Sequence, residues 1–319
     1  MSLTRQYNNA KGIEGFMGNR FQDIMDRVTD HPVKRRCAVV CPDEETLEAA
    51  LDAERLGLVE PFFFFDESRR NVMDGLSALH TRADACIVVE TPEAAAEKAV
   101  KCVRGKEMDI LLKGNIDTAV LLKQVVNKEY GLTTGRLITH VGFLDVPTYH
   151  KLLVVTDGGM VTYPTLEQKR AILENAVFAM RAVGVEKPKV ACLAAVEKVH
   201  ESMPETVDAA ELKAMNERGE ITGCIVEGPI SFDLAFSREA AAVKRYDSPV
   251  AGDADILLVP DFVAGNLLAK AMMHTGHALF AGVLVGASAP VIVTSRSSTS
   301  EEKINSIACS AMLARASLS

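Results

Sequence analysis

The chain has 319 residues, a length typical of two domains with sizeable buried cores. Hydrophobic residues make up 48% and charged residues 24%, which is ordinary globular composition and excludes a disordered or collagen-like chain. The formal net charge of −8 excludes a broad electrostatic footprint for nucleic acid or anionic lipid, so an anionic substrate would need a local cluster of cations.

Short apolar runs alternate along the chain with longer segments of helical period, a pattern typical of βα units around a parallel sheet. Strands are predicted at 37–41, 61–65, 85–89, 109–112, 137–144, 152–156, 190–195, 221–226, 255–259 and 291–294. Helices are predicted at 44–56, 92–104, 165–183, 209–217, 238–246 and 265–280. Several strands are apolar throughout, including the four phenylalanines at 62–65, as expected for strands covered on both faces. The predicted class is therefore α/β.

Three helix starts carry the spacing of a capping box, in which the cap side chain and the third helical residue bond each other's backbone. The pairs are Thr165 with Gln168, Asp208 with Glu211, and Thr299 with Glu302.

The redox state and location follow from the cysteines and the N-terminus. Seven cysteines, an odd number, lie mostly in apolar segments, and we interpret them as reduced core residues. No apolar run reaches the roughly 18 residues of a membrane helix, and the N-terminus lacks the apolar core of a secretory signal. We expect a cytoplasmic protein without a membrane partner or a nucleic-acid partner.

Ligands of open α/β sheets bind beyond the carboxyl ends of the strands, where helix N-termini favour anions. Lys113 and Gly114 follow the predicted strand 109–112 and precede a helix that carries Lys123. A lysine and a glycine at the start of a helix suit an anionic ligand, and a solvated loop is the alternative interpretation.

Two further turns have a similar form. Asp157 follows the strand 152–156, and Asp261 and Asn266 follow the strand 255–259. These side chains suit substrate binding, and equally a glycine turn or a helix cap.

The densest polar turn follows the strand 291–294. Ser295 supplies a hydroxyl, Arg296 a fixed cation, and Glu302 a carboxylate one helical turn later. Arginine suits bidentate recognition of an oxyanion, and a carboxylate suits proton transfer. The alternative for Glu302 is a capping box with Thr299.

The histidines and standard motifs add little. His274 and His277 lack a third ligand, so no metal site is predicted, and His140 inside the apolar run 137–144 is interpreted as a satisfied core residue. No Walker loop, GxGxxG or GxSxG occurs, which removes the usual support for nucleotide hydrolysis and serine-hydrolase chemistry.

These turns, taken together, resemble the phosphate acetyl- and butyryltransferases, and they are closest to the butyryl branch. The matching segments are LLKGNIDTA (111–119), GRLITHV (135–141), LVVTDGGM (153–160), PKVACLAAV (188–196), EGPISFDLA (227–235), SPVAGDAD (248–255), LVPDFVAGN (258–266) and PVIVTSRS (290–297). Several separate motifs in one order are far more specific than any one of them.

The resemblance implies a two-domain, three-layer α/β/α fold of the isocitrate and isopropylmalate dehydrogenase type, with the site between the domains. It places the first domain at 1–139 plus 286–319 and the second at 140–285. It also implies a homodimer or higher homo-oligomer built through the second domain.

The resemblance further implies reversible acyl transfer between acyl-CoA and phosphate, giving acyl phosphate and CoA, with coenzyme A as a substrate and no metal or redox cofactor. It assigns the catalytic roles to Ser295, Arg296 and Glu302, where Glu302 replaces the aspartate of the acetyl enzymes. Lys123 lies near the position of a substrate-binding arginine, and Lys113 and Arg136 are expected to supplement it.

Alternatives stay open at this point. Phosphate acetyltransferase activity is the first of them. A metal- and NAD-dependent β-decarboxylating dehydrogenase on the same fold is a second, although no Asp-x-x-x-Asp pattern follows Asp253 and Asp255. A non-catalytic relative that binds coenzyme A is a third.

Overall fold

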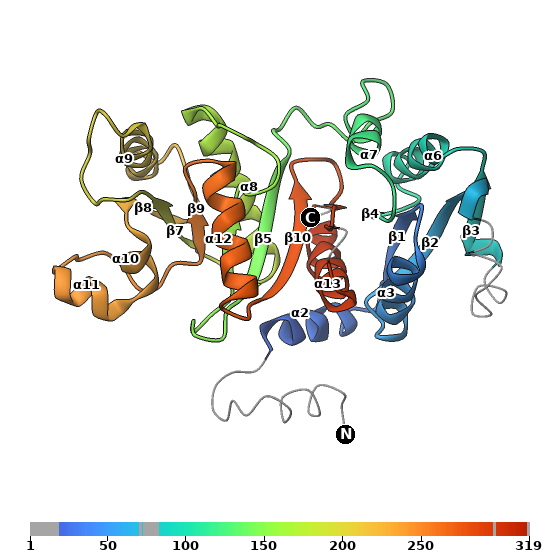
Figure 1. Cartoon of the computed structure of the whole chain (residues 1–319), viewed down its shortest axis with the longest axis horizontal. Helices are drawn as coiled ribbons and strands as arrows, with labels where there is room; N and C mark the ends of the chain where they lie inside the picture. Colours follow the sequence, from blue (N-terminus) through green and yellow to red (C-terminus); the bar gives the residue numbers. More distant parts are fainter. Residues whose placement is uncertain (1–18, 70–71, 73–82, 296–297, 318–319) are drawn as a thin grey trace.

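The computed structural model describes residues 19–69, 72, 83–295 and 298–317, and Figure 1 shows their arrangement. The strands are β1 (Arg35–Val40), β2 (Val59–Asp66), β3 (Cys86–Val89), β4 (Ile110–Lys113), β5 (Thr139–Asp145), β6 (Leu153–Thr156), β7 (Lys189–Leu193), β8 (Ile225–Ile230), β9 (Ile256–Leu258), β10 (Leu279–Val285) and β11 (Val291–Ile292). Within the described residues these eleven strands form one sheet in the order β3-β2-β1-β4-β11-β10-β5-β6-β9-β7-β8.

The sheet has two parallel sets of strands that run in opposite directions. The pairings from β3 to β11 are parallel, and so are those from β6 to β8. Between the sets, β10 is antiparallel to β11 and to β5, and β5 is antiparallel to β6. The central strands β10 and β5 therefore join the two sets.

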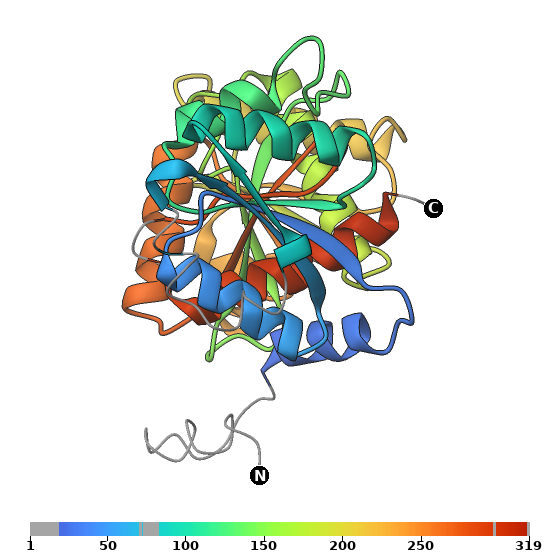
Figure 2. The same ribbon diagram turned by 90° about the vertical axis from the view of Figure 1, so that its right-hand side faces the viewer.

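Helices cover both faces of the twisted sheet, which gives three layers (Figure 2). The helices are α2 (Arg20–Thr29), α3 (Glu44–Arg55), α6 (Pro92–Arg104), α7 (Thr118–Val125), α8 (Leu166–Ala182), α9 (Pro204–Glu217), α10 (Phe232–Phe236), α11 (Arg238–Lys244), α12 (Phe262–His274) and α13 (Ser300–Ala316). The predicted α/β class and layer order are confirmed.

Local chemistry explains why a helix such as α6 forms where it does. Thr91 is the N-cap and accepts a hydrogen bond from the Ala94 N–H, and Pro92 supplies a pre-set φ at the first helical position. The small apolar residues recur at helical spacing and are buried: Ala95, Ala96, Ala99, Val100, Cys102 and Val103. Lys101 and Arg104 in the last turn oppose the partial negative charge of the helix C-terminus.

The two faces of the sheet differ in their cores. On one face a single cluster runs under α2, α3, α13, α8 and α9. On the other face there are two clusters, one under α6 and α7 and another under α10, α11 and α12. Phe63 and Phe65 belong to the first face and Phe64 to the second, so the phenylalanine run is a strand covered on both sides, as predicted.

A strip of sheet separates the two clusters on the second face. We call it the central strip, and it consists of His140 and Gly142 on β5 and Gly282 on β10. It lies between Leu284, which belongs to the α6–α7 cluster, and Leu144, which belongs to the α10–α12 cluster.

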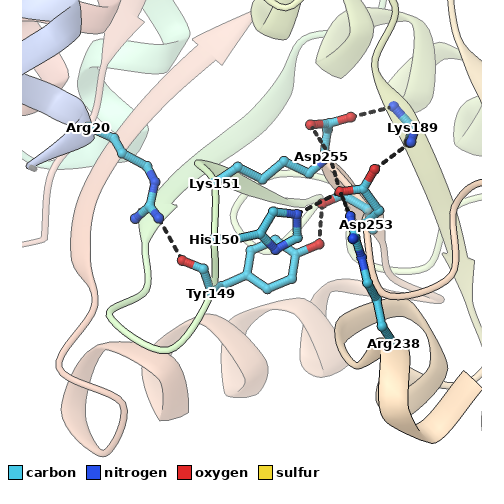
Figure 3. Close-up of polar contacts among 9 residues, drawn as sticks. Arg20, Tyr149, His150, Lys151, Lys189, Arg238, Asp253 and Asp255 are labelled. Carbon is cyan, nitrogen blue, oxygen red and sulfur yellow. Dashed lines mark hydrogen bonds and ion pairs between the residues drawn. The ribbon is translucent and has the colours of Figure 1, made fainter. Parts of the chain in front are cut away.

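Charged side chains hold the amino ends of β6, β7 and β9 together (Figure 3). We call this group the Asp253 cluster, because most of its members contact one carboxylate: His150, Lys151, Lys189, Arg238, Asp253 and Asp255. Next to it, the Tyr149 hydroxyl donates a hydrogen bond to the Ala254 carbonyl, 2.7 Å away, and Arg20 donates to the Tyr149 carbonyl. The cluster thus ties the β5–β6 connection to β9.

Two predicted helices have wrong bounds. The predicted helix 265–280 ends at His274, and its last residues begin β10, a strand that we did not predict. His277 has a φ of +53°, which a continuing helix does not allow. The helix predicted at 209–217 begins at Pro204, so Asp208 is no cap; instead it accepts a hydrogen bond from Lys169 at 2.7 Å.

Other sequence predictions have different outcomes. The seven cysteines are free, and six of them are buried, as expected for reduced core residues. No helix in the described part of the chain is long and apolar enough to cross a membrane. The division into 1–139 plus 286–319 and 140–285 stays a prediction.

Candidate active site

Strand register places several predicted residues around the central strip. Leu111 pairs with Val291, Val291 with Leu284, and Leu284 with His140, so these four residues form one row across the sheet. Side chains alternate between the faces along a strand. Lys113 therefore leaves β4 on the face of Leu111, which is the face of His140.

The His140 ring lies flat on the sheet because glycines surround it. A Cβ on Gly282 would lie 3.0 Å from its Nε2, and a Cβ on Gly142 would lie 3.5 Å from its Cε1. A Cβ on Gly159, in the loop after β6, would lie 2.7 Å from its Cγ. The ring also lies beside Phe280, with ring centroids 6.3 Å apart. The three glycines therefore leave the space that the imidazole occupies.

Asp157 organises the loop that follows β6. Its carboxylate accepts hydrogen bonds from the backbone N–H groups of His140 at 2.9 Å and of Gly159 and Met160 at 2.8 Å each. Met160 packs against the α6–α7 cluster, although its loop follows a strand of the other set. Asp157 thus holds a loop that connects the two sides of the central strip.

Asn266 and Asp261 attach this loop to α12. The Asn266 side chain donates to the Gly158 carbonyl at 3.2 Å, and the Asp261 carboxylate caps the helix by accepting from the Ala264 N–H at 2.9 Å. Gly265 lies so close to Gly158 that a Cβ on either would meet backbone atoms. Both predicted side chains therefore act in loop architecture, and their contact with substrate stays a prediction.

Lys113 and Gly114 lie at the carboxyl end of β4. The Lys113 side chain is buried, and its ammonium donates to the Gly114 carbonyl at 3.1 Å. A Cβ on Gly114 would lie 2.5 Å from the Cys41 carbonyl oxygen, so only glycine permits this close approach to the loop after β1.

Ser295 and Glu302 flank the turn between β11 and α13, and Arg296 lies outside the described residues. Ser295 is exposed, while Glu302 is half-buried in the first turn of α13. Thr299 accepts a hydrogen bond from the Glu302 N–H at 3.2 Å. Among the described residues the Glu302 carboxylate has no hydrogen-bond or ion-pair partner, so the reciprocal half of the predicted capping box is not formed.

The structure does not bring together all the predicted cations. Lys123 is exposed in the last turn of α7. Arg136 precedes β5, so it lies toward the amino end of that strand from His140. Lys113 and Gly142 lie toward the carboxyl ends of β4 and β5, beyond the row that contains Leu111 and His140. Arg136 instead lines two neighbouring cavities of about 360 and 480 Å³ together with Phe178 and Ala316.

Comparison with known proteins identifies the family. The model of the phosphate acetyl/butaryl transferase family matches residues 47–311. The chain belongs to this family. It is therefore an acyltransferase, and the resemblance seen in its motifs is confirmed.

Individual relatives agree with this assignment. A phosphate butyryltransferase of Clostridium beijerinckii is 39% identical over 298 residues, which are 93% of this chain and 99% of the relative. A branched-chain phosphotransacylase from Enterococcus faecalis V583 has a similar structure, with a TM-score of 0.79 and 32% identity, covering 88% of this chain and 99% of that one.

The fold extends beyond the family. A 4-hydroxythreonine-4-phosphate dehydrogenase from Klebsiella pneumoniae superposes with a TM-score of 0.53 at 12% identity, covering 88% of this chain and 100% of that one. At this identity the likeness concerns the fold alone. It confirms the predicted dehydrogenase-like architecture.

Proposed function

We propose that the enzyme transfers a butyryl or similarly short acyl group reversibly between coenzyme A and inorganic phosphate, giving acyl phosphate and free CoA. The likeness of nearly the whole chain to a phosphate butyryltransferase is the observation that carries this proposal. Acetyl transfer is the alternative, because the family includes both activities.

The proposed reaction is direct, and in the CoA-acylating direction it begins with proton transfer. Glu302 takes the proton of the CoA thiol, and the thiolate attacks the carbonyl carbon of acyl phosphate. Ser295 donates a hydrogen bond to the developing negative charge, and Arg296 holds the phosphate that leaves. The Glu302 carboxylate has no hydrogen-bond or ion-pair partner among the described residues, which supports its role as the group that accepts the thiol proton.

Cations on an acidic chain are proposed to hold the anionic substrates. Lys113 supplies a charge at the carboxyl end of β4, and Lys123 and Arg136 are proposed to bind phosphate groups of coenzyme A. Gly114, Asp157, Asp261 and Asn266 are proposed to form the walls of the binding site, with the backbone geometry described above.

The remaining proposals concern the state of the enzyme. We propose a cytoplasmic homodimer or higher homo-oligomer that uses no metal or redox cofactor. Light scattering on the purified enzyme tests the oligomer, and initial rates with and without EDTA test the metal. A loss of rate in EDTA that Mg²⁺ restores would contradict the cofactor proposal.

One assay tests the function as a whole. We expect phosphate-dependent release of CoA from acetyl-, propionyl-, butyryl- and isobutyryl-CoA, with the highest kcat/KM for a four-carbon chain. The highest value for acetyl-CoA would favour the acetyl alternative. No release from any of the four, together with reduction of NAD(P)⁺ in the presence of a 2-hydroxy acid and a divalent metal, would overturn the proposal.

A further inference from the structure

We propose that His140 contacts the substrate, its Nε2 donating a hydrogen bond to an oxygen of the acyl phosphate. The proposal rests on the acyl transfer described under Proposed function and adds a residue to that site. It also replaces the sequence interpretation of His140 as a satisfied core residue.

The first observation is that His140 is not satisfied. Its Nδ1 is buried without a hydrogen-bond partner. Its Nε2 has no hydrogen-bond partner among the described residues either. Buried polar groups in folded proteins are nearly always hydrogen-bonded, so an unpartnered imidazole in a rigid setting requires an explanation.

The second observation is that the ring occupies a space that three glycines leave free. Gly142 and Gly282 lie beneath it, Gly159 lies against its Cγ, and Phe280 lies at its side. Three positions without a Cβ make room for this ring, and its backbone N–H is fixed by Asp157. Nε2 therefore lies over Gly282 of β10, on the side of the ring toward β11 and β4.

The third observation is where the ring lies. His140 lies in the strip between the two clusters of the second face, in one row with Leu111 of β4. The Lys113 side chain leaves β4 on the same face, and Val293, two residues before Ser295, packs in the adjoining cluster. A substrate held by Lys113 and Ser295 that extends across β11 and β10 would meet the His140 ring.

The charge state suits a hydrogen-bond donor. Burial lowers the pKa of His140 below its ordinary value, and the negative charge of Asp157 opposes this shift without cancelling it. The ring is therefore neutral at pH 7, with one N–H to donate and no full charge to desolvate.

His140 contrasts with His150, the histidine of the Asp253 cluster. His150 is largely exposed, and its Nε2 lies 2.6 Å from the Asp253 carboxylate. It has a partner in the fold and does not face the central strip. His150→Phe is therefore a control in which a histidine is lost without loss of a substrate contact.

The experiment uses two replacements of His140 in the full-length enzyme. His140→Phe keeps a flat ring and removes both nitrogens, whereas His140→Gln retains an amide N–H near the position of Nε2. We expect kcat/KM for acyl phosphate to fall roughly 10- to 100-fold in His140→Phe, the range for one hydrogen bond to a charged group. His140→Gln should recover part of this loss, and His150→Phe should keep the wild-type rate.

The outcomes separate this inference from the function on which it rests. A wild-type enzyme without acyl transfer overturns the function. An active wild type with an equally active, folded His140→Phe overturns the role of His140 alone. If His140→Phe does not fold, ¹⁵N NMR of the wild-type imidazole decides: the His140 signal, assigned by its absence in His140→Gln, should shift on addition of acetyl phosphate. An unchanged signal would contradict the contact.

Discussion

The Asp253 cluster and the central strip are two polar regions of one sheet, and they differ in how their groups are partnered. In the cluster, Lys151 lies 2.9 Å from Asp255 and 3.2 Å from Asp253, and Lys189 and Arg238 also contact Asp253. In the strip and the turn after β11, the His140 ring and the Glu302 carboxylate lack partners among the described residues. The contacts of the first region stabilise the fold, and the unpartnered groups of the second region are those that we propose to contact the substrate.

Two helix starts of identical spacing show the same contrast. At α8 the Thr165 hydroxyl accepts from the Gln168 N–H, and the Gln168 side chain accepts from the Thr165 N–H at 3.0 Å. At α13 Thr299 accepts from the Glu302 N–H, but no described contact engages the Glu302 carboxylate. The spacing is the same at both helix starts, but only at α8 does the third side chain bond the backbone of the cap residue. At α13 the Glu302 carboxylate makes no such bond.

Removal of the Glu302 carboxylate is expected to have the largest effect. Glu302→Gln keeps the N–H bond to Thr299 and cannot accept the thiol proton, so kcat should fall about 10²- to 10⁴-fold with little change in Tm. Thr165→Ala is the matched control, which should cost about 1 kcal/mol of stability and leave kcat unchanged. A folded Glu302→Gln enzyme with near wild-type kcat would make Glu302 a cap only.

Substitution of Arg296 is expected to have the second-largest effect on kcat. Its planar guanidinium matches two phosphate oxygens, whereas lysine offers a point charge, so Arg296→Lys should also be impaired. We expect Arg296→Ala to lower kcat about 10²- to 10³-fold. Arg104→Ala, at an exposed arginine in the last turn of α6, is the control in steady-state kinetics and thermal melts. An Arg296→Ala enzyme that melts and turns over like wild type would exclude this turn as the catalytic centre.

Asp253→Asn should weaken the Asp253 cluster and leave the candidate active site intact. Partial burial acts to raise the pKa of the Asp253 carboxyl, but hydrogen bonds from Lys189 and His150 outweigh it and hold that pKa well below its ordinary value. A depressed pKa contributes stability that is present above the unfolded value of about 3.9 and is lost as the pH falls through the folded value.

Urea denaturation measures this contribution. At pH 7 the free energy of unfolding of Asp253→Asn should be lower than that of wild type by about 1–3 kcal/mol, and the difference should shrink as the pH falls below about 4. The kcat of the folded variant should match that of wild type. A difference that grows in acid would contradict the charge-pair explanation.

The sequence predicted the elements that local patterns determine better than those that depend on contacts between distant segments of the chain. Apolar strands such as β1 and β4 were placed to within two residues, because their signal is local. β10 was missed, because its apolar residues follow those of α12 without a proline and it contains Gly282. β8 was predicted four residues too early, since Gly228 and Pro229 are usual strand breakers and yet lie inside it.

The site followed the same rule. Turns after strand ends led to the prediction of Lys113, Asp157 and Ser295 as site residues, because ligands of α/β sheets bind there, and their contact with substrate stays a prediction. His140 was assigned to the core because an apolar run surrounds it. The surroundings of its ring, in which Nδ1 finds no hydrogen-bond partner, include Gly159 and Gly282. These glycines come from other segments of the chain, so no local pattern could reveal the missing partner.

Lys123 should give the smallest effect, because an exposed charge on α7 interacts with a ligand through water. If it helps to hold the phosphates of coenzyme A, Lys123→Glu should raise the KM for CoA by about 2- to 10-fold, the change that one or two surface ion pairs produce. The increase should shrink at high ionic strength, whereas kcat and Tm should stay near wild type. Lys98→Glu, on the neighbouring helix α6, controls for the change in net charge. Equal KM values in the two variants would remove Lys123 from the binding site.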